Sequence, residues 1–513
     1  MANNTPNYEE KKGFFGWIER VGNKIPNPVY LFLLLSIITA IFSMILSYMG
    51  VSAINPTTKE EVQVVNILTS QGIAKFLMNM HKEFVAFPPL ATVFVGTLGL
   101  GVANRSGFLS STLKLAGLFK SKTITTFVVF LIGICGNLVG DAAFVIYPPL
   151  VAILFKNTDR NPLAGLFAAY ASVCCGFGAN LVVGAADASL AGMTEAAAKL
   201  IDPDFVTSPA MGYYFLLAST LFLAPMGTWL HLKYVEPKLD RVGLGRQQNN
   251  AQMDEDFNPV PTAMELKGLK NAGISVLVFV AVVVLMTLPG MPFAAPEGGT
   301  VVTGALLKSI VGLIFFLFYI PGYVYGKTLG TVKNFNDTIG MMTSEIKTLA
   351  SFFVISFFAA QFLAIFRDSN IGLIVAISGG NFLNSSGLQG AWLLAIFVLL
   401  VAFINLFIGS ANAKWAILST IFVPMLMMAG VNPAATQSAY RIGDSLTNNI
   451  SPMFAYMAII LGYAQEYDDR AKFGTVVSYM LPYTLWFGVC WIAFLVIWVF
   501  LGIPFGPGYP GLM

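Results

Sequence analysis

The sequence predicts an all-α polytopic membrane protein with about nine transmembrane helices, two re-entrant helical hairpins of opposite orientation and an inverted repeat. Of its 513 residues, 56% are hydrophobic and only 11% are charged, whereas soluble domains carry about 25% charged residues. Apolar stretches close to the ~20 residues that a crossing helix needs recur along the whole chain. Lys and Arg gather in some connecting segments and are missing from others, which is a signal of membrane topology.

Seven apolar segments are long and regular enough to cross a bilayer as helices. They cover roughly residues 28–50, 84–104, 211–231, 271–289, 303–326, 348–366 and 474–502. Three further apolar regions, roughly 123–156, 163–200 and 390–465, are interrupted by Gly, Pro, Asn, Asp and Ser. The polar, amphipathic residues 1–27 are expected to lie along the cytoplasmic face of the membrane.

The basic residues orient these segments, because cytoplasmic loops carry an excess of Lys and Arg. We place the basic clusters at 11–24, 105–122, 156–160, 233–270, 327–333 and 470–472 inside, and the segments 290–302 and 503–513, which lack Lys and Arg, outside. These assignments agree only if one hairpin enters from the inside near 123–156 and another from the outside near 390–428. The expected order is a cytoplasmic N-terminus (1–27), a first membrane half (28–231), a cytoplasmic loop (232–270), a second membrane half (271–502) and an external C-terminus (503–513).

Short matches between the two halves predict the inverted repeat. Residues 137–142 (Asn-Leu-Val-Gly-Asp-Ala) resemble residues 405–411 (Asn-Leu-Phe-Ile-Gly-Ser-Ala) with one residue inserted. Further along, Asn-Pro at 161–162 corresponds to Asn-Pro at 432–433. Matches in the same order on hairpins of opposite orientation are what an inverted-topology repeat produces. The alternative is chance recurrence of Asn-Pro and Gly-rich turns.

One cluster of ionisable residues lies within the apolar region 390–465. Such groups cost roughly 2.5–3.5 kcal/mol each at membrane depth on insertion scales, so they need a role. Arg441 and Asp444 share a helix face, Asn448 follows on the same side, and Pro452 then breaks the helix. We interpret Arg441 as the group that binds a substrate carboxylate, a bidentate task that suits guanidinium. The alternative is an Arg441–Asp444 pair that only neutralises itself.

A second polar break lies in the first half, where glycines interrupt a helix around Asn180 and Asp187. Exposed backbone carbonyls, the Asn180 amide and the Asp187 carboxylate form a hard-oxygen set that suits Na⁺. The alternatives are that Asp187 takes up protons or that it only caps a helix. We assign ion binding or coupling to Asp187 and Asn180, together with Asn137, Asp141 and Asn448.

The tips of the two expected hairpins complete the predicted site. Asn137 and Asp141 lie on the inner tip, and Asn405, Asn412 and Trp415 lie on the outer tip. Half-helix N-termini beside Gly-rich turns attract anions. Trp415 can stack on an aromatic ring of a solute, or stand in the aromatic belt at the membrane interface.

Several classes of function fit poorly. The net charge of +3 is too small to indicate nucleic-acid binding. The phosphate-binding loop ending in Gly-Lys-Ser/Thr is missing, so ion gradients are the expected energy source. Two histidines and no nucleophile–base pattern argue against an intramembrane enzyme, and Lys414 is expected to snorkel or pair with a carboxylate. An anion channel remains an alternative, because broken helices also build selectivity filters.

At these motifs the chain resembles the p-aminobenzoyl-glutamate transporter (AbgT) family of bacteria. The most specific pieces are residues 409–415 (Gly-Ser-Ala-Asn-Ala-Lys-Trp) and 440–445 (Tyr-Arg-Ile-Gly-Asp-Ser), and the likeness extends over nearly the whole length. The resemblance implies a multi-pass protein of the bacterial inner membrane that forms homodimers in contact with membrane lipid. It also implies import of p-aminobenzoyl-glutamate, a folate breakdown product, or proton-driven export of sulfonamide-type antimetabolites.

The resemblance also implies which residues carry the function. Carried over to this sequence, the family's functional positions fall on Asp187, Asn405, Asn412, Trp415, Pro433, Arg441, Asp444 and Pro452. Asn412 departs from the pattern, since relatives commonly have Ser there. The implied solute is an anion with carboxylates and an aromatic ring, which gives Arg441 and Trp415 partners. The expected protein is an ion-coupled secondary transporter with Na⁺ or H⁺ as coupling ion and no other cofactor.

Overall fold

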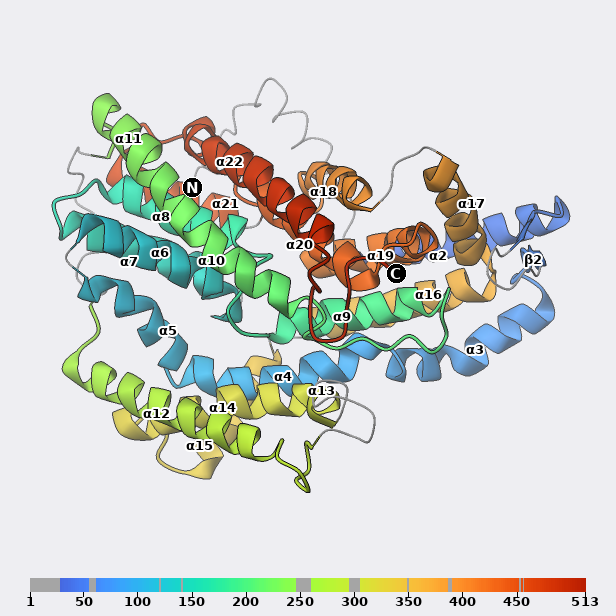
Figure 1. Cartoon of the computed structure of the whole chain (residues 1–513), viewed down its shortest axis with the longest axis horizontal. Coiled ribbons are helices and arrows are strands. Elements are labelled where there is room, and N and C mark those ends of the chain that lie inside the picture. The colour runs from blue at the N-terminus through green and yellow to red at the C-terminus, as the bar shows by residue number, and fades with distance from the viewer. Residues whose placement is uncertain are drawn as a thin grey trace, which may run out of the picture.

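Most of the described residues of this computed structural model lie in helices, and the rest form turns, loops and one short β-hairpin (Figure 1). The structure describes residues 28–54, 61–119, 121–139, 142–245, 260–294, 305–347, 350–385, 390–451, 454 and 456–513. The interfacial segment expected at residues 1–27 lies outside the described residues. Two expected site residues, Asp141 and Pro452, also lie outside them.

The seven apolar segments that were expected to cross a membrane all form helices. They are α2 (Pro28–Tyr48), α4 (Pro88–Arg105), α10 (Tyr213–Leu230), α12 (Ala263–Leu285), α14 (Ile310–Leu329), α16 (Ala350–Asp368) and α22 (Phe473–Phe500). In the described part of the chain, five helices are long and apolar enough to span a bilayer. A sixth span results if α16 and α17 (Ile371–Ser385), which meet at a 70° bend, are counted together.

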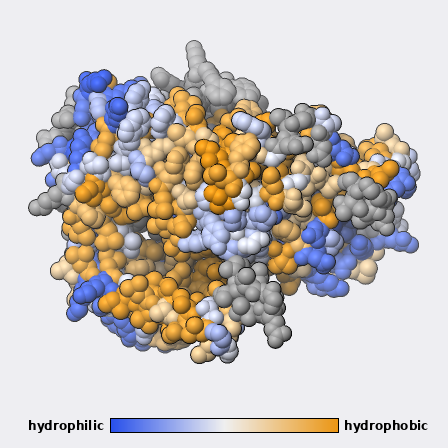
Figure 2. All heavy atoms as spheres, viewed as in Figure 1, coloured by the Kyte–Doolittle hydropathy of each residue, from blue (hydrophilic) through white to orange (hydrophobic). Residues whose placement is uncertain are grey.

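Large apolar side chains cover the outer faces of several helices. Leu277 on α12, Val489 on α22 and Leu399 on α18 (Ala391–Asn405) are 70%, 67% and 59% exposed. Figure 2 shows hydrophobic atoms over most of one face, with hydrophilic atoms gathered toward the two ends of the long axis. Soluble monomers rarely expose apolar patches of this extent, so these faces are suited to lipid.

One group of helices surrounds α4 and α16. Helix α4 packs on α14 and α15, α14 packs on α12, and α16 packs on α2 and α3. Gly99 permits the close approach of α4 to α14, because a Cβ there would lie 2.2 Å from the carbonyl oxygen of Phe315. The sequence did not predict the two amphipathic members of this group, α3 (Ser70–Val85) and α15 (Phe335–Ile346).

A second group is built around two central helices, α8 and α20. Helices α6 and α7 pack on α8, and α18 and α19 pack on α20, while α22 packs on both central helices. Helix α9 joins the two groups, because it packs on α4 and on α19. The bounds are α6 (Lys122–Cys135), α7 (Ala142–Lys156), α8 (Pro162–Cys175), α9 (Ala185–Ala198), α19 (Ala411–Met428) and α20 (Pro433–Thr447).

The two central helices begin in the same way and are buried along almost their whole length. Asn161 and Asn432 cap them, each accepting a hydrogen bond from the backbone N–H two residues on. Pro follows each cap at the first helical position, where its missing N–H would be unpaired in any case. Every residue of α20 is buried, and so is every residue of α8 after its first proline. The polar residues of α20 are therefore shielded from bulk water and need partners inside the protein.

The remaining elements are short or peripheral. The β-hairpin pairs its strands antiparallel, with Ala53 opposite Val62. The elements are β1 (Ser52–Ile54), β2 (Glu61–Gln63), α5 (Phe108–Leu113), η1 (Lys114–Leu118), η2 (Gly136–Val139), the π-helix η3 (His231–Val235), α11 (Glu236–Val242), α13 (Ala305–Lys308) and α21 (Tyr456–Tyr467).

A buried carboxylate joins the end of α11 to the loop before α22. Asp468 accepts hydrogen bonds from the Nε and Nη2 of Arg470 at 2.9 and 2.8 Å, and from the Gly245 N–H at 2.8 Å. Arg470 also donates to the Gly243 carbonyl at 3.0 Å. The Arg470 hydrogen bonds, followed by that from Gly245, lower the pKa of Asp468 to about 2 against the opposing effect of burial.

We expect Asp468→Asn to destabilise the solubilised protein by about 1–3 kcal/mol, because it removes a charge-assisted network. The folded pKa lies below the unfolded value, so the stabilisation is complete above about pH 5 and is lost as pH falls toward 2. Thermal unfolding in detergent at several pH values measures this. The gap in Tm between wild type and variant should be constant at neutral pH and narrow below pH 4. A gap that widens on acidification would contradict the assignment.

Candidate functional site

The centre of the predicted site is an ion pair between the two halves of the chain. Arg441 on α20 donates through Nη1 to Asp187 on α9, and both residues are only 3% exposed. Nη2 of Arg441 also donates to the Phe177 carbonyl at 3.2 Å, in the non-helical stretch after α8. The second oxygen of Asp187 accepts the Gly184 N–H at 2.7 Å. The carboxylate therefore caps α9 and neutralises Arg441 at the same time.

A second buried ion pair lies three residues further along α20, which is less than one helical turn. The Lys414 ammonium is 2.6 Å from Oδ1 of Asp444, and both residues are almost fully buried. The ammonium also donates to Oδ1 of Asn405 and, at 3.4 Å, to the Ile408 carbonyl in the turn between α18 and α19. This pair fixes both arms of the α18–α19 hairpin to α20.

Asn405 connects the hairpin to the end of α20. Its amide nitrogen lies within donor distance of the Asp444 carbonyl at 2.7 Å, Thr447 Oγ1 at 3.0 Å and Asn448 Oδ1 at 2.8 Å. Its amide oxygen accepts from Lys414. The amide orientation is therefore determined by its surroundings, with acceptors around the nitrogen and a cation at the oxygen.

Trp415 lies in the wall of the same region and is fully buried. Its ring stacks on Tyr440 with centroids 4.3 Å apart, and its Nε1 donates to Thr194 Oγ1 on α9 at 3.0 Å. The hydroxyl of Tyr440 donates to the Ala411 carbonyl at 2.6 Å. These contacts join α9, α19 and α20, so the alternative of a belt tryptophan at the membrane interface does not describe Trp415.

The structure places the other expected residues around these pairs. Asn412 accepts from Ser189 on α9 at 3.2 Å, and Pro433 is the first residue of α20. Asn180 is 3% exposed, and its amide oxygen accepts the Leu181 N–H at 2.9 Å. The nitrogen of Asn137 donates to the Ile134 carbonyl at 3.1 Å and to the Gly176 carbonyl at 3.4 Å. The predicted ion-binding roles of Asp187, Asn180, Asn137, Asp141 and Asn448 stay predictions.

Gly178 allows the break after α8 to approach the site closely. A Cβ at this position would lie 2.7 Å from the Arg441 carbonyl oxygen and 2.8 Å from Ser445 Oγ. Real Cβ atoms essentially never come so near, so any larger residue must displace α20. The glycine in this stretch therefore permits the Arg441 side chain to reach Phe177.

Three of the buried polar atoms that lack a hydrogen-bond partner in the described part of the chain belong to residues of the predicted site. They are Nε of Arg441, Oδ2 of Asp444 and Oδ1 of Asn137. Most buried polar atoms in folded proteins are bonded, so these atoms retain capacity for a solute, water or an ion. The Arg441 Nε is a donor on a cationic group, and the two oxygen atoms are acceptors. Within the described residues, no group of three or more His, Cys, Asp or Glu could hold a metal ion.

The structure corrects one sequence-based alternative. Arg441 and Asp444 do not neutralise each other, because Arg441 pairs with Asp187 and Asp444 pairs with Lys414. The expected carboxylate partner of Lys414 exists, but the sequence did not identify it. The signal was present, since a Lys within an apolar helix needs an opposite charge or a route to the interface.

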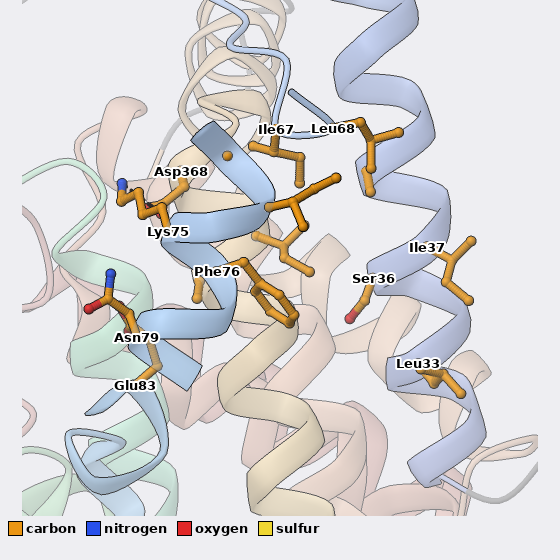
Figure 3. A pocket seen from close by; sticks show the side chains of 15 residues that line it. Leu33, Ser36, Ile37, Ile67, Leu68, Lys75, Phe76, Asn79, Glu83 and Asp368 are labelled. Atoms are coloured by element: carbon orange, nitrogen blue, oxygen red, sulfur yellow. Dashed lines mark ion pairs between the residues drawn. The ribbon is translucent and has the colours of Figure 1, made fainter. Parts of the chain in front are cut away.

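A separate cleft lies away from these charges, between α2, α3 and α16 (Figure 3). Its volume is roughly 270 Å³. Leu33, Ile37 and Phe76 supply apolar surface, whereas Lys75 and Asp368 form an ion pair of 2.8 Å at the lining. The cleft shares no residue with the charge pairs, so we do not assign the solute to it.

Two sequence comparisons with known proteins point to the same family. A family model described as “AbgT putative transporter family” matches residues 13–512. The chain is 37% identical over 509 residues to the p-aminobenzoyl-glutamate transport protein of Escherichia coli (strain K12), and the match covers 99% of each chain.

Two solved structures share the fold over nearly the whole chain. Neisseria gonorrhoeae MtrF, described as illuminating a class of antimetabolite efflux pumps, is 40% identical with a TM-score of 0.90. That match covers 97% of this chain and 100% of MtrF. The Alcanivorax borkumensis YdaH transporter, described as having an unusual topology, is 34% identical with a TM-score of 0.88. That match covers 94% of this chain and 100% of YdaH.

We expect Asp187→Ala and Arg441→Ala each to destabilise the protein by about 3–5 kcal/mol, because each leaves a buried charge without its partner. The double variant should lose much less than the sum of the two single losses. Thermal unfolding of the four proteins in detergent measures this coupling. The exposed pair Arg367–Glu83, with N and O 2.7 Å apart, is the matched control and should contribute less than about 1 kcal/mol. Additive losses at Asp187 and Arg441 would argue against the pair.

Proposed function

Because the chain belongs to the AbgT family of transporters, we propose that it moves p-aminobenzoyl-glutamate or a related aryl-glutamate anion across the bacterial inner membrane. The observation that carries this proposal is the buried Arg441–Asp187 pair between the two halves. We propose an ion-coupled secondary mechanism, with the N-terminus inside, the C-terminus outside and the subunits paired as homodimers. The exposed apolar faces of α12 and α22 support lipid contact.

Competition for Arg441 provides a physical route to coupling. A solute carboxylate that binds the guanidinium must share it with Asp187 or displace Asp187, since the pair is buried and the donors are limited. A displaced Asp187 carboxylate would be a buried charge without a counter-ion, which is costly. Uptake of H⁺ or Na⁺ removes that cost, so anion binding and cation binding at Asp187 favour each other.

The unpaired atoms on α20 support an aromatic amine with an acid group. Nε of Arg441 can donate to a carboxylate, and Oδ2 of Asp444 can accept from an amine. The two residues are separated by less than one helical turn, so one solute can reach both. An aryl-glutamate with a free p-amino group carries both functions.

A second candidate function is export of sulfonamide-type antimetabolites driven by a proton gradient. The similarity to MtrF supports it. A sulfonamide drug carries the same p-aminophenyl group beside an acidic group, so the same two atoms of α20 can recognise it. An anion channel is the alternative from another class, because re-entrant hairpins also occur in channels.

Uptake of radiolabelled p-aminobenzoyl-glutamate into liposomes that hold the purified protein tests the proposal. We expect saturable accumulation when a sodium or a proton gradient is imposed. The rate of this uptake should fall by at least about tenfold in Asp187→Asn, which keeps the shape of the side chain but removes its charge. Asp204→Ala removes an exposed carboxylate and is the control that should retain uptake. All variants should elute as folded protein before assay.

The other outcomes separate the alternatives. Accumulation of a labelled sulfonamide inside liposomes whose interior is more acidic than the medium, without aryl-glutamate uptake, would support the exporter. Flux that neither saturates nor responds to a gradient would support a channel. Normal gradient-driven uptake by Asp187→Asn would contradict the coupling role of Asp187.

A further inference from the structure

The Lys414 ammonium lies in a shell of oxygen atoms inside the protein. The shell consists of the Asp444 carboxylate at 2.6 Å, the Asn405 amide oxygen and the Ile408 carbonyl at 3.4 Å. The lysine side chain is fully buried. One carboxylate, one amide oxygen and one main-chain carbonyl are the types of ligand that hard cations such as Na⁺ use.

The shell lies at a helix break, and the free carbonyls at helix breaks coordinate cations in several families of secondary transporter. Asn405 is the last residue of α18, Ile408 belongs to the turn that follows, and Lys414 lies in the first turns of α19. The C-terminal end of α18 presents free carbonyls and a partial negative charge, which favour a cation. The N-terminal end of α19 disfavours one, so the carboxylate of Asp444 is needed to hold the ammonium there.

The shell does not depend on Lys414 for its shape. Asn405 directs its nitrogen to the Asp444 carbonyl, Thr447 and Asn448, which leaves its oxygen facing the cation. Thr447 in turn donates to the Ala402 carbonyl at 2.8 Å. None of these bonds involves Lys414, so we expect them to remain when the lysine side chain is removed, and its loss would leave room for an ion and water.

We propose that Lys414 is a tethered cation that fills an intramembrane cation site, and that removal of its side chain opens this site to Na⁺. The ammonium of Lys is a compact point charge and can replace a small ion, whereas the planar guanidinium of Arg441 cannot. A buried ion pair is often no more stabilising than apolar residues of similar size, so stability alone does not account for it. With Lys414 in place, Asp444 already holds a cation in this shell and needs no sodium.

The consequence for coupling rests on the proposed transport function. Both buried carboxylates are paired with a cation of the chain, Asp444 with Lys414 and Asp187 with Arg441. Of these two cations only Arg441 is proposed to bind the solute, so Asp187 is the carboxylate that exchanges its partner. Coupling to a sodium or proton gradient therefore passes through Asp187 and not through Asp444.

Thermal unfolding of the purified protein in detergent tests the proposal, with NaCl replaced by choline chloride at constant ionic strength. We expect Lys414→Ala to gain a saturable rise in Tm of about 3 °C between 1 and 300 mM NaCl, beyond any rise in wild type. Lys414→Met fills the same volume without charge and should not gain this rise. Lys414→Ala combined with Asp444→Asn should lose it.

The proposal is overturned if Lys414→Ala gains no sodium-specific rise, or if Lys414→Met gains the same rise. It is also overturned if sodium stabilises the wild type and Asp444→Asn abolishes that effect. If Lys414→Ala folds poorly, its recovery as a monodisperse protein is compared in sodium and choline buffers. Recovery in sodium alone supports the site, and recovery in neither overturns it. None of these measurements uses a solute, so they are independent of the uptake experiment.

Discussion

Neutralising charge inside a membrane is the constraint on which the centre of this protein depends. A carboxylate or ammonium that is removed from water must be paired and hydrogen-bonded. Here Asp187 meets Arg441 and Asp444 meets Lys414, and the members of each pair come from different helices. The pairs therefore specify how α9, α19 and α20 assemble, and not only the local face of one helix.

The helix breaks lie where the buried basic groups need hydrogen-bond acceptors. Each basic group contacts one carboxylate and one main-chain carbonyl from a non-helical stretch, which is Phe177 for Arg441 and Ile408 for Lys414. A continuous helix offers no free carbonyl in its interior, so the chain must break where a buried cation needs one. Polar and Gly-rich interruptions in apolar segments are thus the sequence feature that supplies free carbonyls to buried cations.

The sequence was sufficient for the apolar helices, because composition and helix-breaking residues are local properties, whereas the roles of the expected site residues stay predictions. It missed α3 and α15, whose amphipathic character differs from that of a crossing helix. It also left open the partner of Arg441. Neighbours on one helix face can point to different helices, and only the tertiary packing selects Asp187 over Asp444. The stacking of Trp415 on Tyr440 could not be predicted from sequence for the same reason, since the two residues lie on different helices.

The alternation of charge along α20 also limits how this helix can move. Sliding it by about one turn, roughly 5.4 Å, in one direction would bring Asp444 toward Asp187, and in the other direction Arg441 toward Lys414. Both displacements would oppose like charges in a medium that screens them poorly. While both pairs are formed, helix α20 is therefore held in register with α9 and α19, and we expect these three helices to move together as one unit. Alternating access would then have to come from displacement at the boundary of that unit, such as the contact of α9 with α4.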